Sequence, residues 1–412
     1  MTLDFALTPR QRDLRARARS VARDVLRDAR SAERLATPEE RFLATRPAYE
    51  RLISEGFLRA CLPTAVGGDN ECLVDTAVVV EELFAENGSV ALTLLGTVLG
   101  VTPVIVGGTP EQHKQLLAPF LETTGAPLAA FCSNEPGGSA NAASPPPGEG
   151  VRTRAVRADG RWVINGRKKW VSSATGWQRD GADLLCVVCR TDENAPPESA
   201  ISMIAVEKPS GVELDRVIAS PGYRAHLLPE ITLRDVTAPE ENLLGAEGAG
   251  LRLSGASFAG ASALVGLMGV GLMRSAFVHA WEFARTEHRG GTAPILTHQA
   301  VGYALADAKI AIEAVRALSL RACWSVDHRE PAAAELAHSA KVFASETAVR
   351  VITDLMRVVG VDSYDDVDPL GSLLQDALAL PIFAGGNVGV RRRALHALLM
   401  SPDYDPLATS ET

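Results

Sequence analysis

The sequence is short of aromatic residues and cysteine, and it carries no excess of positive charge. Only 5% of the 412 residues are aromatic, so alanine, leucine and valine must fill most of the core. The 6 cysteines are too few and too scattered for a disulfide scaffold. Lys and Arg number 41 against 50 Asp and Glu, which gives a net charge of -9. An acidic surface repels phosphate backbones, so we expect no nucleic acid partner.

The sequence also offers little to a metal ion. Cys186 and Cys189 form the only CxxC spacing, inside the apolar run 182–190 that predicts a buried strand. Positions three apart on a strand point to opposite faces. No second cysteine or histidine pair follows at zinc spacing, so we expect no metal.

Two long uncharged stretches raise the question of a membrane. Residues 87–110 and 253–273 are each long enough to span a bilayer. Glycine and proline in the first, and many small residues in the second, favour buried helices instead, and we expect no membrane partner. The N-terminal segment 1–23 lacks the apolar core of a signal peptide, so we expect a cytoplasmic protein.

Periodicity divides the chain into three regions, which predict an α+β protein. Residues 1–128 have a helical pattern, residues 129–240 a period near two, and residues 241–412 a helical pattern again. Asp159-Gly160 and Asn165-Gly166 lie between apolar runs and predict hairpin turns in an antiparallel β domain. A 4-3-4-3 spacing predicts a long bundle helix in the third region, at Val301, Leu305, Ala308, Ile312 and Val315.

Five local strings occur in an order that resembles the acyl-CoA dehydrogenase superfamily over essentially the whole chain. They are FCSNEPGGS at 131–139, NGRKKWVSS at 165–173, NLLG at 242–245, AKVFASE at 340–346 and IFAGGN at 382–387. The resemblance implies an N-terminal helical domain, a central β domain and a C-terminal four-helix bundle. It also implies FAD between the β domain and the bundle, in a homodimer or homotetramer.

The resemblance assigns flavin contacts to the first two strings. Asn134 takes the place of a threonine, and its amide can still donate to the pyrimidine oxygen. Trp170 matches the aromatic residue beside the isoalloxazine, and Ser172 matches a hydroxyl near flavin N5. Neighbouring contacts are expected from Phe131, Ser133 and Ser139.

The adenine and pyrophosphate contacts in the family usually come from a neighbouring subunit, and here their motifs have changed. His288 stands where the family has arginine, with Arg289 as a possible substitute, just before His298-Gln299. The usual Gln-x-x-Gly-Gly has become RVVGV at 357–361. The resemblance therefore implies dinucleotide contacts from His288, Arg289, Gln299, Arg357 and Gly360, and further cofactor contacts from Gly386 and Asn387.

The family's catalytic carboxylate is missing from both of its usual places. Removing a proton beside a thioester needs a positioned base, in most members a Glu. That position is Ala384 here, and the alternative position on the following domain is Ala261. The catalytic residue is therefore unknown. The candidate pocket residues are Ser262, which replaces an arginine, with His226, Phe383 and Ala384.

Three mechanisms remain open, and we favour the first. In the first, the substrate supplies its own carbanion, for example a β-keto acid losing CO2, with O2 reacting afterwards in specialised metabolism. In the second, the fold hosts a flavin monooxygenase. In the third, an ordinary acyl-CoA or acyl-carrier-protein dehydrogenase uses a relocated acid at Glu81, Glu82 or Glu86. A non-catalytic binding protein is the remaining class.

Several details stay open from sequence alone. The substrate's identity, its attachment to CoA or a carrier protein, and the electron acceptor, O2 or an electron-transfer flavoprotein, are not specified. The run Arg391-Arg392-Arg393 predicts a solvated helix face or a subunit contact rather than an anion site.

Overall fold

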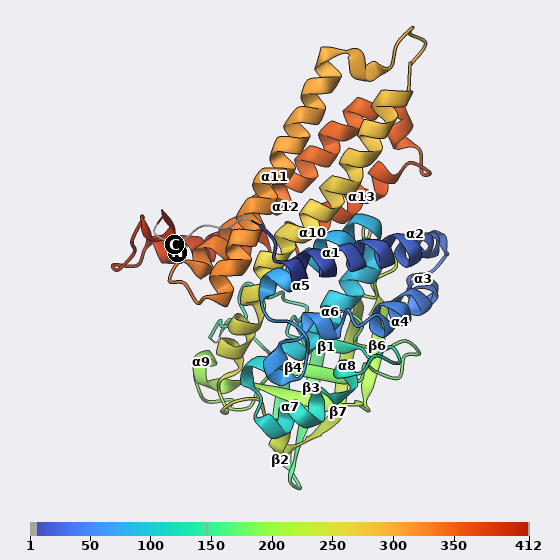
Figure 1. The fold of residues 1–412 in the computed structure, drawn as a ribbon. Helices are drawn as coiled ribbons and strands as arrows, with labels where there is room; N and C mark the ends of the chain where they lie inside the picture. Colours follow the sequence, from blue (N-terminus) through green and yellow to red (C-terminus); the bar gives the residue numbers. More distant parts are fainter. Residues whose placement is uncertain (1–5, 146, 411–412) are drawn as a thin grey trace.

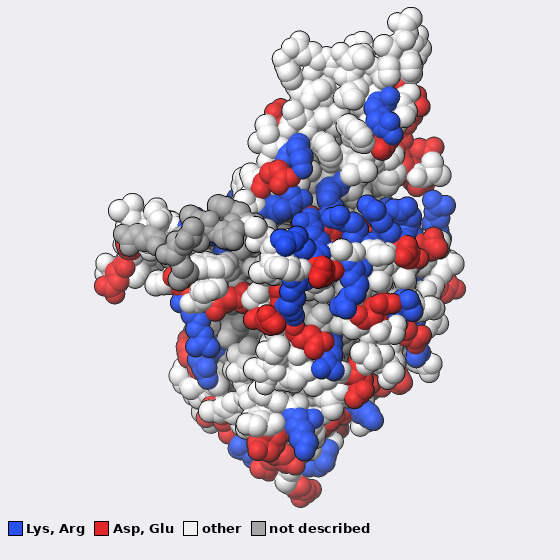
Figure 2. All heavy atoms as spheres, in the orientation of Figure 1, with Lys and Arg blue, Asp and Glu red and all other residues white. Residues whose placement is uncertain are grey.

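The computed structural model describes residues 6–145 and 147–410, so residues 1–5, on which part of the signal-peptide expectation rests, lie outside it. N-terminal helices cover the β-sheet, and a long helical bundle extends away from both (Figure 1). Charged residues of both signs are mixed over the lower part of the molecule, whereas the outer bundle carries few charges in this view (Figure 2).

The N-terminal domain is helical, as predicted. Helix α1 begins after Thr8, whose hydroxyl accepts from the backbone of Gln11 in a reciprocal capping box. Asn87 caps the uncharged helix α6 in a similar way, by accepting from the Val90 backbone. The helices are α1 (Pro9–Val21), α2 (Arg27–Ala29), α3 (Pro38–Ala44), α4 (Arg46–Ser54), α5 (Leu73–Glu86), α6 (Gly88–Gly107), α7 (Pro110–Leu116) and α8 (Ala118–Leu121).

The middle domain is one seven-stranded sheet in the order β1-β4-β2-β3-β7-β6, with β5 pairing β4. Its strands are β1 (Ala129–Cys132), β2 (Arg154–Ala158), β3 (Arg161–Lys169), β4 (Leu184–Arg190), β5 (Ile201–Glu207), β6 (Val212–Val217) and β7 (Pro229–Pro239), with the short helix α9 (Pro197–Ala200) before β5. Most pairs are antiparallel, as expected, but β1 and β2 each pair with β4 in parallel. The long chain between β1 and β4 allows the crossover that a parallel pair requires.

One predicted turn is present and the other is wrong. Asp159-Gly160 connects β2 to β3, as predicted. Asn165-Gly166 instead lies inside β3, at a register irregularity against β7. The Asn165 amide donates to the Asp235 carboxylate at 2.9 Å. A Cβ on Gly166 would lie 2.5 Å from Thr153 Oγ1, so the glycine serves a bulge and a close backbone approach.

The C-terminal domain is a four-helix bundle followed by a short helical segment. Its helices are α10 (Gly250–Thr286), α11 (Gln299–Asp327), α12 (Ala333–Val359) and α13 (Pro369–Ala379), with a π-helical turn at Asn387–Arg392 and α14 (Arg393–Leu399) after them. The predicted α11 stripe is confirmed: Leu305, Ala308, Ile312 and Val315 are buried, and Val301 is half-buried.

The two uncharged stretches form helices α6 and α10. By length and composition alone, both are long and apolar enough to cross a membrane. The most apolar windows of α6 and α10 are 56% and 72% buried inside the protein. Helix α10 packs against α5, α6, α11, α12 and α13. It therefore connects the N-terminal helices to the bundle, and the predicted site strings lie around this junction.

Candidate active site

The end of β3 presents a large aromatic face. Trp170 follows the last β3 residue, Lys169, and is 48% exposed. The Lys169 amide donates to the Asn134 carbonyl at 3.0 Å, which joins the two strings predicted to contact the flavin. Phe131 on β1 is buried, with its ring 5.2 Å from that of Phe258 on α10. An exposed indole beside these residues offers a flat apolar surface of the kind that a flavin ring covers.

Behind Trp170, Ser172 belongs to a buried hydrogen-bond chain. Thr93 on α6 donates its only hydroxyl hydrogen to the Ser89 carbonyl, so His226 Nδ1 must donate to Thr93 Oγ1, 2.9 Å away. His226 Nε2 then accepts from Ser172 Oγ at 3.0 Å. Burial lowers the pKa of His226 to about 3, so the ring is neutral. Ser172 is left with oxygen lone pairs, rather than a hydrogen, for any further partner.

Some of the strained backbone positions and unpaired hydroxyls of the described residues lie in the same region. Trp170, Ser173, Tyr223 and Ala384 all have φ between 48° and 61°. Each such non-glycine residue costs roughly 1 kcal/mol or more and is typical of functional sites. Among the described residues, Ser173 Oγ, Thr175 Oγ1 and Tyr223 Oη are buried without a hydrogen-bond partner. Exposed indole and unpaired hydroxyls together fit a bound polar aromatic group such as FAD.

Two strings that are far apart in the sequence meet at Asn387. Its side-chain oxygen accepts from Lys341 Nζ at 2.6 Å, and its amide donates to Ser345 Oγ at 3.0 Å and to Glu346 Oε1 at 3.1 Å. Burial lowers the pKa of Lys341 to about 7. These contacts fix the turn that contains Ala384 against helix α12.

The position of the missing base lies beside a buried cation. The Ala384 carbonyl accepts from Arg391 Nη2, and Nη1 of Arg391 lies 3.3 Å from His338 Nδ1. Arg391 is only 4% exposed, and its Nε has no partner among the described residues. Burial lowers the pKa of Arg391 to about 10, so it remains charged at neutral pH. The expectation that this arginine run forms a solvated face is therefore wrong for Arg391, although Arg392 is exposed.

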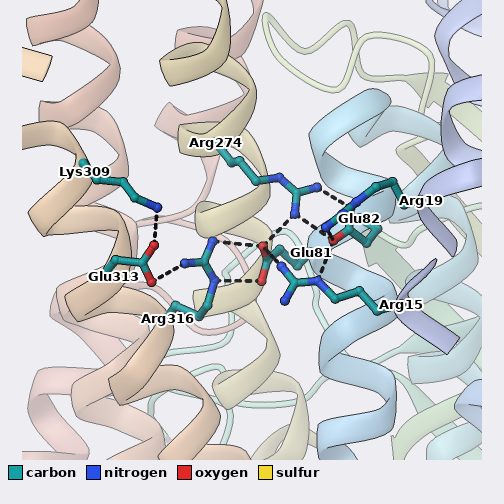
Figure 3. Close-up of polar contacts among 8 residues, drawn as sticks. All are labelled: Arg15, Arg19, Glu81, Glu82, Arg274, Lys309, Glu313 and Arg316. Carbon is teal, nitrogen blue, oxygen red and sulfur yellow. Dashed lines mark hydrogen bonds and ion pairs between the residues drawn. The ribbon is translucent and has the colours of Figure 1, made fainter. Parts of the chain in front are cut away.

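The acids considered as relocated bases are held elsewhere. Glu81 and Glu82 on α5 form ion pairs with arginines from α1, α10 and α11 (Figure 3). Burial alone would raise the pKa of Glu82, but hydrogen bonds from Arg19 and Arg274 outweigh it and lower the pKa to about 2. Glu86 pairs with the exposed Arg27. Glu82 is therefore poorly suited to accept a proton, and Glu81 and Glu86 are also held in ion pairs with arginine.

The residues predicted for the dinucleotide half lie at the free end of the bundle, where α10 ends, α11 begins and α12 ends (Figure 1). All of them are exposed: His288, Arg289, Gln299, Arg357 and Gly360. Arg289 donates to the Val359 carbonyl at 2.7 Å, and Arg357 to Asp354 at 2.7 Å. Within a single chain these residues lie away from Trp170. Their contribution to the flavin site of a second subunit therefore stays a prediction.

The remaining predicted residues have ordinary surroundings. Ser262 is buried, and its hydroxyl donates to the Phe258 carbonyl one helical turn earlier, at 2.8 Å. Phe383 is half-buried, with its ring 6.2 Å from Tyr223. Among the other predicted site residues, Ser139 is exposed, and the half-buried ones are Ala261, Ser133 and Gly386. Within residues 6–145 and 147–410, no group of three metal-ligating side chains occurs.

Sequence reasoning missed the surroundings of Arg391. The spacing between Ala384 and Arg391 was visible, but a run of three arginines ordinarily marks a solvated surface. His338 carried no signal, because its role depends on the packing of α12 against the last turn. The one signal was that Arg391 directly follows the apolar residues that come after the IFAGGN string, which could have suggested a buried cation.

Family comparisons cover nearly the whole chain. Three family models match: the acyl-CoA dehydrogenase N-terminal domain at residues 8–124, the middle domain at 130–236 and the C-terminal domain at 248–399. The nitroalkane oxidase of Podospora anserina is 40% identical over 422 residues, covering 98% of each chain. Its solved structure covers 100% of both chains with a TM-score of 0.94 and 38% identity.

Two further solved structures bear on the site. One is a nitroalkane oxidase crystallised with 1-nitrooctane after replacement of an active-site aspartate by asparagine; it is 33% identical, covers 99% of each chain and has a TM-score of 0.95. The other concerns the roles of an arginine and an aspartate, seven residues apart, in the reaction of nitroalkane oxidase. It is 33% identical, covers 99% of each chain and has a TM-score of 0.93.

Proposed function

This chain belongs to the acyl-CoA dehydrogenase family and is an FAD-dependent oxidoreductase, and we propose that its substrate reaches the flavin already as a carbanion. The first candidate is a nitronate, the deprotonated form of a nitroalkane. A β-keto acid, which yields an enolate by losing CO2, belongs to the same class. The observation that carries the proposal is the alanine at position 384.

The spacing supports the loss of a catalytic aspartate. In the nitroalkane oxidase relatives, the aspartate precedes the arginine by seven residues. Ala384 precedes Arg391 by the same interval, and the two are hydrogen-bonded. Ala384 also keeps a φ of 50°, a left-handed conformation that Asp and Asn adopt far more readily than Ala. The backbone therefore has the conformation that suits the missing residue.

The family's usual means of removing a proton from carbon is missing, because positions 384 and 261 are both alanine. General-base catalysis is worth ~10²–10⁴-fold in rate. Glu81 and Glu82, the acids that could have replaced it, are held by arginines. A preformed carbanion does not need this step. The alternative of an ordinary acyl-thioester dehydrogenase with a relocated base thus loses Glu81 and Glu82 as candidate bases.

The remaining requirements are positioning and exclusion of water, and the chain's own residues can meet them. Trp170 supplies a flat face for the flavin ring, and Phe383 with Tyr223 forms an apolar wall beside Ala384. Bound FAD supplies two-electron oxidation, with O2 as final acceptor. The overall reaction balances as nitronate plus O2 plus water giving an aldehyde, nitrite and hydrogen peroxide.

Anaerobic mixing of the purified holoenzyme with separate substrates tests this proposal. We expect rapid bleaching of the flavin absorbance by ethyl nitronate or a short β-keto acid, and very slow bleaching by a saturated acyl-CoA. Fast bleaching by the acyl-CoA would contradict the proposal, since it would require a base. Bleaching by NADPH alone, with no response to any carbanion, would favour a monooxygenase instead.

A further inference from the structure

The structure assigns the guanidinium of Arg391 as the binding site for the substrate's anionic head, a nitronate or carboxylate group, with His338 as its positioning residue. This inference deepens the proposed function and rests on it for the class of substrate. It predicts that the enzyme selects its substrate by charge as well as by the reactivity of its carbon.

Among the described residues, no carboxylate pairs with the buried charge of Arg391. A buried cation is costly unless it is paired, and removal of a counterion leaves that cost in place. Both partners of Arg391 are neutral, namely the Ala384 carbonyl and the His338 imidazole. The adjacent Arg392 provides a contrast, since both of its terminal nitrogens bind Glu346, at 2.7 and 2.9 Å. The buried arginine therefore lacks a counterion, whereas the exposed arginine has one.

The guanidinium also has unused donors. An arginine carries five N–H groups. Arg391 uses one on the Ala384 carbonyl and one on His338, and its Nε is buried without a partner. Planar two-oxygen anions match the guanidinium fork with two parallel hydrogen bonds. Nitronates and carboxylates both have this shape.

A glycine lets the Arg391 guanidinium pack closely against the turn that contains Ala384. Gly385 has a φ of 77°, and a Cβ built there would lie 3.0 Å from both Nε and Nη2 of Arg391. Any other residue at this position would crowd the guanidinium. Since Gly385 follows Ala384 directly, the anion site and the position of the missing base share one turn.

His338 orients Arg391 without neutralising it. Its Nδ1 accepts from Arg391 Nη1, which requires the neutral imidazole. Burial, followed by the nearby Arg391 charge, lowers the pKa of His338 to about 4. An acidic residue at this place would satisfy the cation and compete with a ligand. A neutral acceptor holds the fork in place and leaves its charge for the substrate.

The test measures binding of propionate and nitrate, which the enzyme does not oxidise, by the absorbance change of the bound flavin and by competition against ethyl nitronate. We expect saturable binding to the wild-type holoenzyme and a loss of about 10- to 100-fold in Arg391→Gln. His338→Asp should weaken binding similarly while Arg391 remains. His338→Asn, which keeps a neutral acceptor, should retain most of it. Arg392→Gln is the matched control and should bind as wild type.

The outcomes separate this inference from the proposed function. Unchanged propionate and nitrate binding in both Arg391→Gln and His338→Asp would overturn the inference, even with nitronate oxidation intact. Anion binding that depends on Arg391 in an enzyme that oxidises neither nitronate nor β-keto acid would uphold the inference and contradict the proposed function. Should Arg391→Gln fail to retain FAD, the His338→Asp variant decides, because it keeps the arginine.

Discussion

The carbonyl oxygen of Ala384 accepts a hydrogen bond from Nη2 of the buried Arg391. This contact joins the position where the family has its carboxylate base to a cation that has no counterion in the described part of the chain. An aspartate at 384 would place its carboxylate beside Arg391, which would keep that carboxylate ionised and fix its orientation. With alanine, the same turn has lost the base and kept the cation.

Ala384→Asp should therefore restore proton abstraction. We expect flavin reduction by neutral nitroethane to accelerate by ~10²–10⁴-fold, the usual range for a positioned base. The left-handed backbone at 384 should accept aspartate with less strain than alanine. Stopped-flow absorbance under anaerobic conditions measures the rate. Ala384→Asn is the control, because it has the same shape and cannot act as a base. Equal rates in the two variants would count against the assignment of this position.

Glu82→Gln distinguishes a structural carboxylate from a relocated base. Removing one partner from a buried ion pair typically costs about 3–5 kcal/mol, because the other charges are left unpaired. Arg19 and Arg274 both contact Glu82, so urea denaturation should show a large loss of unfolding free energy. Flavin reduction by ethyl nitronate should be unchanged in the folded variant.

The matched control for this measurement is Glu86→Gln. Glu86 pairs with Arg23 and Arg27, which are both exposed, and such pairs contribute ~1 kcal/mol or less. A folded Glu82→Gln enzyme that loses nitronate oxidation would show that Glu82 takes part in the reaction.

Stability should fall as the pH drops below about 6.5, in part because of His226. Burial lowers its folded pKa from 6.5 to about 3, so only the unfolded chain binds the proton in this window. Each pH unit between those values removes ~1.4 kcal/mol of stability from this group alone. His338 acts in the same direction, and Asp376, whose pKa burial raises to about 8, acts in the opposite direction.

The measurement is the difference between wild type and His226→Gln in unfolding free energy, taken at pH 7 and at pH 5 by urea denaturation. The other titrating groups cancel in that difference. We expect the advantage of wild type over the variant to shrink by about 2 kcal/mol on acidification. A pH-independent difference would mean that His226 is not a neutral buried ring.

The chain should form at least a dimer through its C-terminal helices. Trp281, Tyr303 and Ile310 on the bundle are 40%, 60% and 67% exposed, and exposed apolar groups of this kind are typical of interfaces. Ile310→Glu should shift sedimentation toward monomer and weaken FAD retention. Val156→Glu is the control, since Val156 is 58% exposed on β2 of the sheet. A flavin-containing wild-type monomer at micromolar concentration would contradict the prediction.

Much of the fold was predictable because local patterns and tertiary packing agree. The α11 stripe, the β2–β3 turn and the helical regions follow directly from spacing and turn chemistry. Asn165-Gly166 was misleading, since the same dipeptide serves a turn or a bulge and only the cross-strand contact with Asp235 decides between them. The site was partly predictable: the strings located Trp170, Ser172 and Ala384.

Arg391 was not predictable, because burial of a charge depends on long-range packing. The three consecutive arginines cannot be distinguished in the sequence. In the structure, Arg391 is buried against Gly385, whereas Arg392 is exposed and pairs with Glu346. The His226 chain was hidden for the same reason, because Thr93 lies on α6, 133 residues away in sequence.

The most direct test of the central claim is the aerobic rate of nitroethane oxidation as the enzyme concentration is raised. An enzyme without a base must wait for nitroethane to ionise in solution. The rate should therefore reach a plateau that further enzyme does not raise, while preformed ethyl nitronate is consumed in proportion to enzyme. Proportionality to enzyme with neutral nitroethane would contradict the account, because it would show that the protein removes the proton itself.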